Sequence, residues 1–120
     1  MKRVKSREEL RDILKSAENS DKRAVLLKFS AEWCEPCKIM KKEIESVKDD
    51  LKDIEIVEID VNDAEEIAEL FRVGAVPTFM LIKREEIKVK EDGSVSVTCI
   101  PLMGAISGKD LVEWIRDHLR

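Results

Sequence analysis

The sequence contains little of what interrupts secondary structure, with 4 glycines and 3 prolines among 120 residues. It has no apolar run of the roughly 18 residues that a membrane-spanning helix requires. Its first residues, Met1–Lys5, are basic but lack a following apolar segment, so we expect no signal peptide. No basic stripe is present, and 26 acidic residues outnumber 22 basic ones. We therefore expect neither a membrane nor a nucleic acid among the partners.

Cysteine is scarce as well, with only Cys34, Cys37 and Cys99. An odd, small number of cysteines does not make a framework of structural disulfides. In a reducing compartment, closely spaced cysteines are more often catalytic or metal-binding than structural. Without an expected signal peptide or membrane span we predict a cytoplasmic protein, and we therefore place its chemistry at Cys34 and Cys37. For Cys99 we expect the role of a small apolar filler.

Charge, in contrast, is abundant, since 40% of the residues are charged and 43% are hydrophobic. A charged share well above the usual value of about a quarter indicates a surface dense in ion pairs. A chain of this length can bury a core without disulfides. We predict a single domain over residues 1–120.

Apolar periodicity predicts alternating helices and strands in the first half of the chain. Helices are expected over about 7–17, from Pro36 to near residue 50, and over about 64–71; strands are expected over 25–29 and 54–59. Ser6 and Glu9 form a capping box for the first helix, while Asp60 and Asn62 are candidate caps for the third. This order implies βαβ units and a core of parallel strands.

The second half of the chain has a different pattern. A strand over 78–82 is followed by two alternating runs that flank Glu91-Asp92-Gly93. A three-residue loop with Gly93 in a left-handed conformation pairs Val89 with Val95 and Ile87 with Val97, so that all four apolar side chains share one face. We expect this hairpin to extend over about 83–103. Its apolar stripe needs a cover, which the protein's own helix, a dimer or a partner could provide. Ser107 and Asp110 then cap a final helix.

Cys34 and Cys37 are separated by two residues at the start of a predicted helix, where they can form and break a disulfide with little backbone movement. The N–H groups and the dipole at a helix start stabilise a thiolate. Thiolate is the species that attacks a disulfide. We predict that Cys34 attacks a substrate disulfide and that Cys37 then resolves the mixed disulfide.

The stretch Phe29–Lys38, which contains Trp-Cys-Glu-Pro-Cys, resembles the active site of the thioredoxin family. Val76-Pro77-Thr78 resembles the cis-proline loop of that family, and Gly104 resembles the glycine before its last helix. The resemblance covers essentially the whole chain. It implies an α/β protein with the thioredoxin fold: a central mixed β-sheet flanked by helices on both faces, here with an extended C-terminal β-hairpin. It also implies a thiol–disulfide oxidoreductase.

The resemblance further implies roles for individual residues. Cys34 would be the exposed nucleophile and Cys37 the buried resolving thiol. Pro77 would be cis and would face the disulfide, and the backbone of Val76 would pair with an extended substrate segment. The substrate groove would be formed by Trp33, Pro36, Val76, Pro77, Gly104 and Ala105.

The implied partners are disulfide-containing proteins and a reductase or another dithiol that donates electrons. The implied biological role is electron transport in cell redox homeostasis. The redox-active disulfide would be the only redox group, with no cofactor and no metal. We expect a monomer, with a dimer through the hairpin as the alternative.

Two residues depart from the family pattern. Glu35 stands where the family usually has glycine, and its carboxylate should disfavour the Cys34 thiolate and make the pair a stronger reductant. Lys28 stands where thioredoxins carry a buried aspartate. A charged Lys28 would favour thiolates and a more oxidising pair, a desolvated one could act as a neutral base, and Glu58 on the neighbouring strand could neutralise it. The sequence leaves these alternatives open.

Two other functions compete with reduction of disulfides. The cysteine pair could belong to a disulfide oxidase or isomerase, or the chain could be a binding module that acts through its hairpin. A zinc site normally needs four ligands, and only Cys99 and His118 remain as candidates, without motif spacing. His118 is expected to favour the dipole at a helix end, and Trp114 is expected in the core or at a helix edge.

Overall fold

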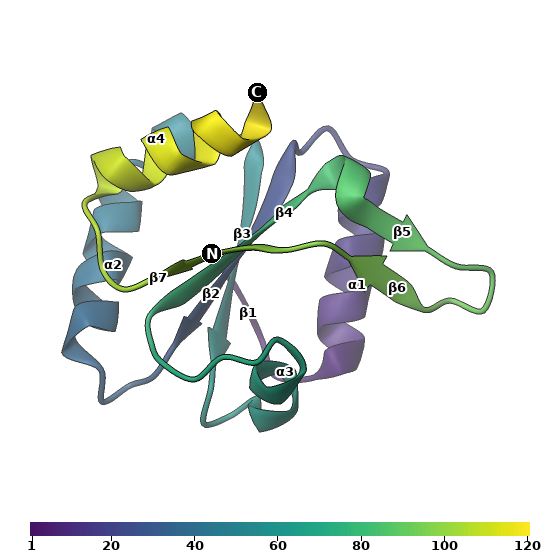
Figure 1. The fold of residues 1–120 in the computed structure, drawn as a ribbon, viewed down its shortest axis with the longest axis horizontal. Helices are drawn as coiled ribbons and strands as arrows, with labels where there is room; N and C mark the ends of the chain where they lie inside the picture. Colours follow the sequence, from purple (N-terminus) through teal and green to yellow (C-terminus); the bar gives the residue numbers. More distant parts are fainter.

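A five-stranded mixed β-sheet forms the centre of the protein (Figure 1). The computed structural model describes residues 1–120. The strands lie in the order β1 (Lys2–Val4), β3 (Ile54–Asp60), β2 (Ala24–Ser30), β4 (Thr78–Lys83) and β7 (Ile100–Met103). The first three are parallel, and β4 runs antiparallel to both β2 and β7. The predicted mixed sheet is therefore confirmed.

Helices cover both faces of the sheet, as Figure 1 shows. The helices α1 (Arg7–Glu18) and α3 (Glu65–Leu70) pack on one face, and α2 (Glu35–Ser46) and α4 (Gly108–Leu119) pack on the other. None of these helices has the length and apolar character needed to cross a membrane. A 3-10 turn, η1 (Lys48–Leu51), follows α2, so the second helix ends before residue 50.

The strand β2 is buried along its whole length, as the continuous apolar run predicts. Leu27 and Phe29 pack towards α1 and α3, whereas Leu26 packs towards α2 and α4. Burying a large apolar side chain completely contributes about 1.5–3 kcal/mol. This strand is therefore the main apolar element of the core, and Lys28 is its one charged residue.

Two helix starts confirm the predicted caps. The backbone N–H of Glu9 donates to Ser6 Oγ at 3.1 Å, and that of Asp110 donates to Ser107 Oγ at 3.1 Å. The prediction for α3 is wrong. Its N-cap is Ala64, which makes no capping side-chain bond. Asp60 and Asn62 form a turn before the helix instead, because the carboxylate of Asp60 accepts the Asn62 N–H at 2.8 Å.

The predicted pairing of the hairpin is confirmed, but its predicted extent is wrong. The strands β5 (Ile87–Val89) and β6 (Val95–Val97) pair in the expected register, and Gly93 has a φ of 87°. They form a separate two-stranded sheet, preceded by a 3-10 turn, η2 (Arg84–Glu86). Residues 100–103 belong to β7 at the edge of the main sheet. The strand β1 was not predicted at all.

The apolar stripe of the hairpin is covered by α1. Ile87 is fully buried, and Val95 and Val97 pack against the cluster that contains Leu10 and Leu14 of α1. Figure 1 shows β5 and β6 beside this helix. Of the open alternatives, the protein's own helix thus covers Ile87 and part of Val95 and Val97, while Val89 stays 37% exposed.

The last helix is tied to the loop before β3 by one ion pair. The guanidinium of Arg116 donates to both oxygens of Asp53 at 2.7 and 2.8 Å and to the carbonyl oxygen of Asp50 at 2.7 Å. These hydrogen bonds hold the pKa of Asp53 below its usual value. A carboxyl whose pKa is lowered in the folded state stabilises the protein above its unfolded pKa, and this contribution is lost as the pH falls through the folded pKa.

We expect Arg116→Met to lower the free energy of unfolding by about 1 kcal/mol at neutral pH. The difference from wild type should shrink as the pH falls below about 4, the ordinary pKa of an aspartate in the unfolded chain, towards the lowered pKa of Asp53 in the folded state. The free energy of unfolding of both proteins is measured by urea unfolding at neutral pH and again below about pH 4. The matched control is Arg120→Met, which removes only an exposed pair with Asp117. A loss in Arg116→Met that does not change with pH would contradict the assignment to the Asp53 charge.

Candidate active site

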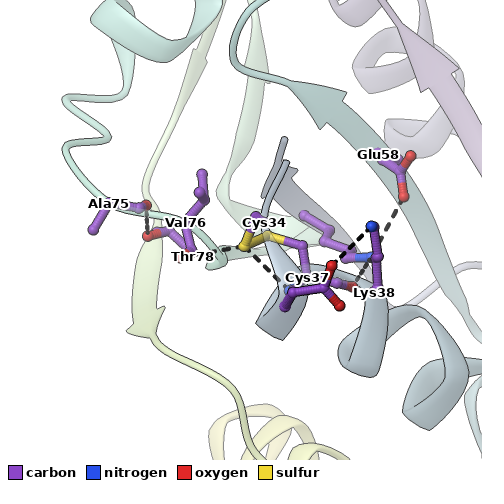
Figure 2. Close-up of a disulfide and its surroundings, with 9 residues drawn as sticks. Cys34, Cys37, Lys38, Glu58, Ala75, Val76 and Thr78 are labelled. Carbon is purple, nitrogen blue, oxygen red and sulfur yellow. Dashed lines mark hydrogen bonds and ion pairs between the residues drawn. A yellow bond between two sulfur atoms is a disulfide. The ribbon is translucent and has the colours of Figure 1, made fainter. Parts of the chain in front are cut away.

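The chain leaves β2 at Ser30, makes one turn and enters α2 with a disulfide between Cys34 and Cys37 (Figure 2). Cys34 is the N-cap residue of α2, and its Sγ accepts the backbone N–H of Cys37 at 3.2 Å. Pro36 lies in the first turn, where its missing N–H leaves no hydrogen bond unmade. The Cys34 sulfur therefore lies at the positive end of the helix, as the motif predicts.

Both sulfur-bearing residues are buried in this oxidised state, Cys34 with 4% and Cys37 with 3% of their surface exposed. The expectation of an exposed Cys34 beside a buried Cys37 is therefore wrong for the disulfide form. The cause is a loop distant in sequence, since the Val76 carbonyl oxygen lies 3.8 Å from Cys34 Sγ. Ala31 and Val76 pack around the two sulfurs.

The loop that covers Cys34 contains a cis peptide bond between Val76 and Pro77, as the resemblance implies. Figure 2 shows Val76 beside the Cys34 end of the disulfide. The hydroxyl of Thr78 donates to the Ala75 carbonyl at 2.7 Å, and the Pro77 carbonyl accepts the N–H of Gly104 at 2.9 Å. The first hydrogen bond fixes the loop internally, and the second ties it to the segment at the end of β7.

Around this loop lies an exposed rim of predicted and unpredicted residues. Trp33, next to Cys34 in the chain, is 69% exposed, and Pro36, Gly104 and Ala105 are exposed as well. Gly104 has a φ of 92°, a conformation that favours glycine. Sequence reasoning missed Met103, which is 74% exposed and pairs with Thr78 across the sheet edge, because its segment was assigned to the hairpin.

Comparisons with known proteins agree with this geometry. The sequence model of the family described as Thioredoxin matches residues 4–113. The chain belongs to the thioredoxin family. It is 37% identical over 103 residues to Thioredoxin Y1, chloroplastic, from Arabidopsis thaliana, which covers 85% of this chain and 53% of that protein. It is 38% identical over 88 residues to the thioredoxin of Gallus gallus, covering 73% of this chain and 83% of that protein.

A solved structure gives the same result. The thioredoxin of Fasciola hepatica superimposes with a TM-score of 0.75 at 26% identity, covering 98% of this chain and 99% of that one. The Cys34–Cys37 pair at the start of α2 has the spacing of a Cys-x-x-Cys active site, which agrees with membership of the thioredoxin family. The chain spans about half the length of the chloroplastic relative, at 53%.

Lys28 departs from other thioredoxins and lies directly behind Cys37. It is 1% exposed, and its Nζ donates to the Cys37 carbonyl at 3.3 Å and to Glu58 Oε2 at 3.4 Å. The two residues are partners in the β2–β3 register, so Glu58 does balance the charge of Lys28, which was one of the alternatives. Burial lowers the pKa of Lys28, and Glu58 opposes this shift.

Arg3 of β1 adds a second cation to the ion pair between Lys28 and Glu58. Arg3 Nε lies 3.4 Å from Glu58 Oε1, and Arg3 Nη2 lies 4.0 Å from Asp60 Oδ2. These side chains, together with Lys28 and Cys37, line a polar cavity of about 220 Å³. Figure 2 shows Glu58 on the side of the disulfide opposite Val76. Cys37 therefore has polar surroundings on the side away from the cis-proline loop.

Glu35, the second departure, lies on the surface. Its carboxylate is 3.0 Å from Lys38 Nζ, one turn further along α2, and both side chains are exposed. The negative charge beside Cys34 thus has a positive partner on the same helix. Its effect on the Cys34 thiolate is reduced by this partner and by solvent.

The remaining candidate residues lie apart from the disulfide. Cys99 is half-buried against the cluster under α1, where burial raises the pKa of its thiol to about 11. His118 lies on α4, on the opposite side of the sheet, with Nδ1 2.8 Å from the Trp114 carbonyl oxygen. Trp114 packs at the edge of the core, as expected. The structure does not bring Cys99 and His118 together.

We expect Lys28→Met to move the alkylation of Cys37 to higher pH by about one unit, because the Glu58 carboxylate then lacks its cation and disfavours a nearby thiolate. The measurement is the rate of iodoacetamide modification of Cys37 against pH, in a Cys34→Ser background. Peptide mass spectrometry separates Cys37 from Cys99.

Two variants serve as controls for this shift. The double variant Lys28→Met, Glu58→Gln removes both charges and should return the profile close to that of the parent. Lys48→Met removes a cation whose partner is the exposed Glu45, and should leave the Cys37 profile in place. An unchanged profile in Lys28→Met would show that Lys28 has no influence on Cys37.

Proposed function

We propose that this chain reduces disulfide bonds in other proteins, with Cys34 as the attacking thiol and Cys37 as the resolving thiol. The observation that carries the proposal is the N-cap position of Cys34, whose Sγ receives the Cys37 N–H at 3.2 Å. A reduced Cys34 at this position is stabilised as a thiolate. Cys37 lies one turn into the helix and cannot use the same N–H groups.

The cycle moves two electrons from the chain to its substrate. The Cys34 thiolate attacks one sulfur of the substrate disulfide, forms a mixed disulfide and releases the other substrate sulfur as a thiolate. Cys37, as thiolate, then attacks Cys34 Sγ, which forms the Cys34–Cys37 disulfide and releases the second substrate thiolate. Protons from water convert both products to thiols. A dithiol donor or a reductase returns the chain to its reduced form.

The rim around Cys34 supplies a surface for an extended substrate segment. The N–H of Val76 makes no hydrogen bond within the chain and lies in the loop that contacts Cys34. Trp33 and Met103 offer exposed apolar surface near this loop. A substrate strand that pairs with Val76 would bring its disulfide to Cys34, with apolar side chains on Trp33 and Met103.

Whether the cysteine pair reduces or oxidises its substrates depends on Lys28 and Glu35, the two residues that differ from the family pattern. Lys28 has Glu58 as its partner, and Glu35 has Lys38. Neither carries an unbalanced charge, so neither shifts the relative stability of thiolate and disulfide far. We therefore place the pair with the reducing members of the family, near the value of about −270 mV typical of thioredoxin.

The working context is part of the same proposal. The partners are disulfide-containing proteins and a dithiol or reductase that donates electrons, and the role is cell redox homeostasis. Three cysteines, one of them a free half-buried thiol, suit a reducing compartment such as the cytoplasm. The disulfide serves as the only redox group. The packing of Ile87, Val95 and Val97 against the α1 side of the core favours a monomer.

We expect Cys34→Ser to abolish the dithiothreitol-dependent reduction of insulin, since no other sulfur occupies the N-cap, and Cys37→Ser to accumulate a mixed disulfide between Cys34 and insulin. Turbidity and non-reducing gels measure the two effects. Cys99→Ser should keep activity within about twofold of wild type, because Cys99 lies outside the site. Reduction of insulin by Cys34→Ser at the wild-type rate would overturn the proposal.

The equilibrium potential against glutathione should lie within about 40 mV of −270 mV, and Glu35→Gln should change it by less than about 15 mV, because Lys38 and solvent already reduce the effect of the carboxylate. A value near −120 mV would instead identify an oxidase and would show that the charges of Lys28 and Glu58 do not balance at the thiols.

A further inference from the structure

A second concavity lies away from the disulfide, on the face of the sheet that α1 and α3 cover. It has a volume of about 580 Å³, and its walls come from α1, the end of α3, β6 and the segment that leads into β7. Figure 1 shows these elements on the side of the sheet opposite α2 and α4. The hairpin contributes one wall through β6.

The inner surface of this groove is apolar. Leu10 and Leu14 from α1, Met80 from β4, and Val95 and Val97 from β6 line it. Its volume falls within the range of about 300–1,000 Å³ that is typical of sites for small organic ligands. Leu10, Leu14 and Met80 are already buried by the fold, so an apolar molecule would displace water mainly from the partly exposed Val95 and Val97.

The charged residues of the groove are all cationic. Arg7, Arg11 and Arg72 line it and no acidic residue does, although the whole chain has a net charge of −4. Arg7 is paired with Glu66 at 3.1 Å. Arg11 and Arg72 have no carboxylate within 4.0 Å, so their guanidinium groups are available to an anion.

Arg72 also occupies an unusual backbone position. Its φ of 56° makes it the only residue other than glycine with a positive φ, directly after the end of α3. Glycine is the preferred residue at such a helix end, because a side chain is strained there. The chain instead carries an arginine whose side chain lines the groove. A strained residue at a cavity is an observation that points to use of its side chain.

We infer that this groove binds a single-chain amphiphile with a carboxylate head group. The carboxylate lies between Arg11 and Arg72, where guanidinium groups from two walls donate hydrogen bonds to it. The apolar chain lies on Leu14, Met80 and Val95. The site is separate from the disulfide and would bind the oxidised chain as well as the reduced one.

In the oxidised chain, the thiol of Cys99 can report whether a ligand occupies the groove. With Cys34 and Cys37 in a disulfide, Cys99 is the only free thiol, and it lines the groove. The probe is decanoate, kept below its micelle concentration, and the matched probe is decanol, which has the same chain without the charge. Titration calorimetry gives the affinities, and alkylation of Cys99 by iodoacetamide at about pH 9.5 gives the location.

We expect one decanoate to bind per chain, at least about tenfold more tightly than decanol, and to slow the alkylation of Cys99 by about fivefold or more at saturation. Arg72→Gly should bind decanoate about tenfold more weakly while melting at the same or a higher temperature, because glycine relieves the backbone strain. Arg11→Gln should weaken binding to a similar extent. Lys109→Gln, which removes one exposed charge from α4, should bind like wild type.

The inference is overturned if decanoate does not bind, if it binds no more tightly than decanol, if Arg72→Gly and Arg11→Gln both keep the wild-type affinity, or if saturation leaves the alkylation of Cys99 unchanged. None of these measurements requires turnover. Insulin reduction by Arg72→Gly and Arg11→Gln should equal that of wild type, so failure of this inference is distinguishable from failure of the proposed reductase function.

Discussion

Burial of β2 on both faces is the constraint on which the other elements depend. A strand without an exposed residue needs a strand on each side and a helical layer above and below, and β3, β4 and the four helices fill these places. Since β2 runs directly into the turn before α2, the same burial fixes where Cys34 begins that helix. The position of the reactive sulfur is therefore a consequence of core packing.

Lys28, the one charged residue of β2, is buried with the rest of the strand. A lysine taken out of water is costly unless a counterion and hydrogen bonds accompany it. Glu58 is its register partner on β3, and the Cys37 carbonyl accepts another of its hydrogen bonds. The core thus contains a polar connection from the disulfide to Arg3 on β1. Position 28 therefore joins the sheet to the backbone of Cys37.

The sequence predicted those parts of the fold that depend on residues close together in the chain. The buried run of β2, the register of Val89 with Val95 and the capping residue Ser6 all follow from local rules. It failed for β1, which has three residues of which only Val4 is buried, because such a strand has no readable alternation. It also failed for β7, whose pairing partner β4 lies beyond the hairpin.

At the active site too, local features could be predicted and contacts between distant segments could not. The cysteine motif and Pro77 were evident from the sequence, and Glu58 could be named because adjacent parallel strands place it opposite Lys28. The burial of Cys34 could not be predicted, since it depends on Val76, which lies 42 residues further along the chain. The groove had no sequence signal, because its residues come from four separate segments that only the folded chain brings together.

The strand order has a consequence for synthesis on the ribosome. The strand β2 lies between β3 and β4 and emerges before either of them. Its β3 side can pair once residue 60 is available, but its β4 side stays bare until residue 83 has left the exit tunnel. During that interval the most apolar strand of the chain has an open edge, which is the kind of surface that chaperones bind and that nascent chains on neighbouring ribosomes can pair with.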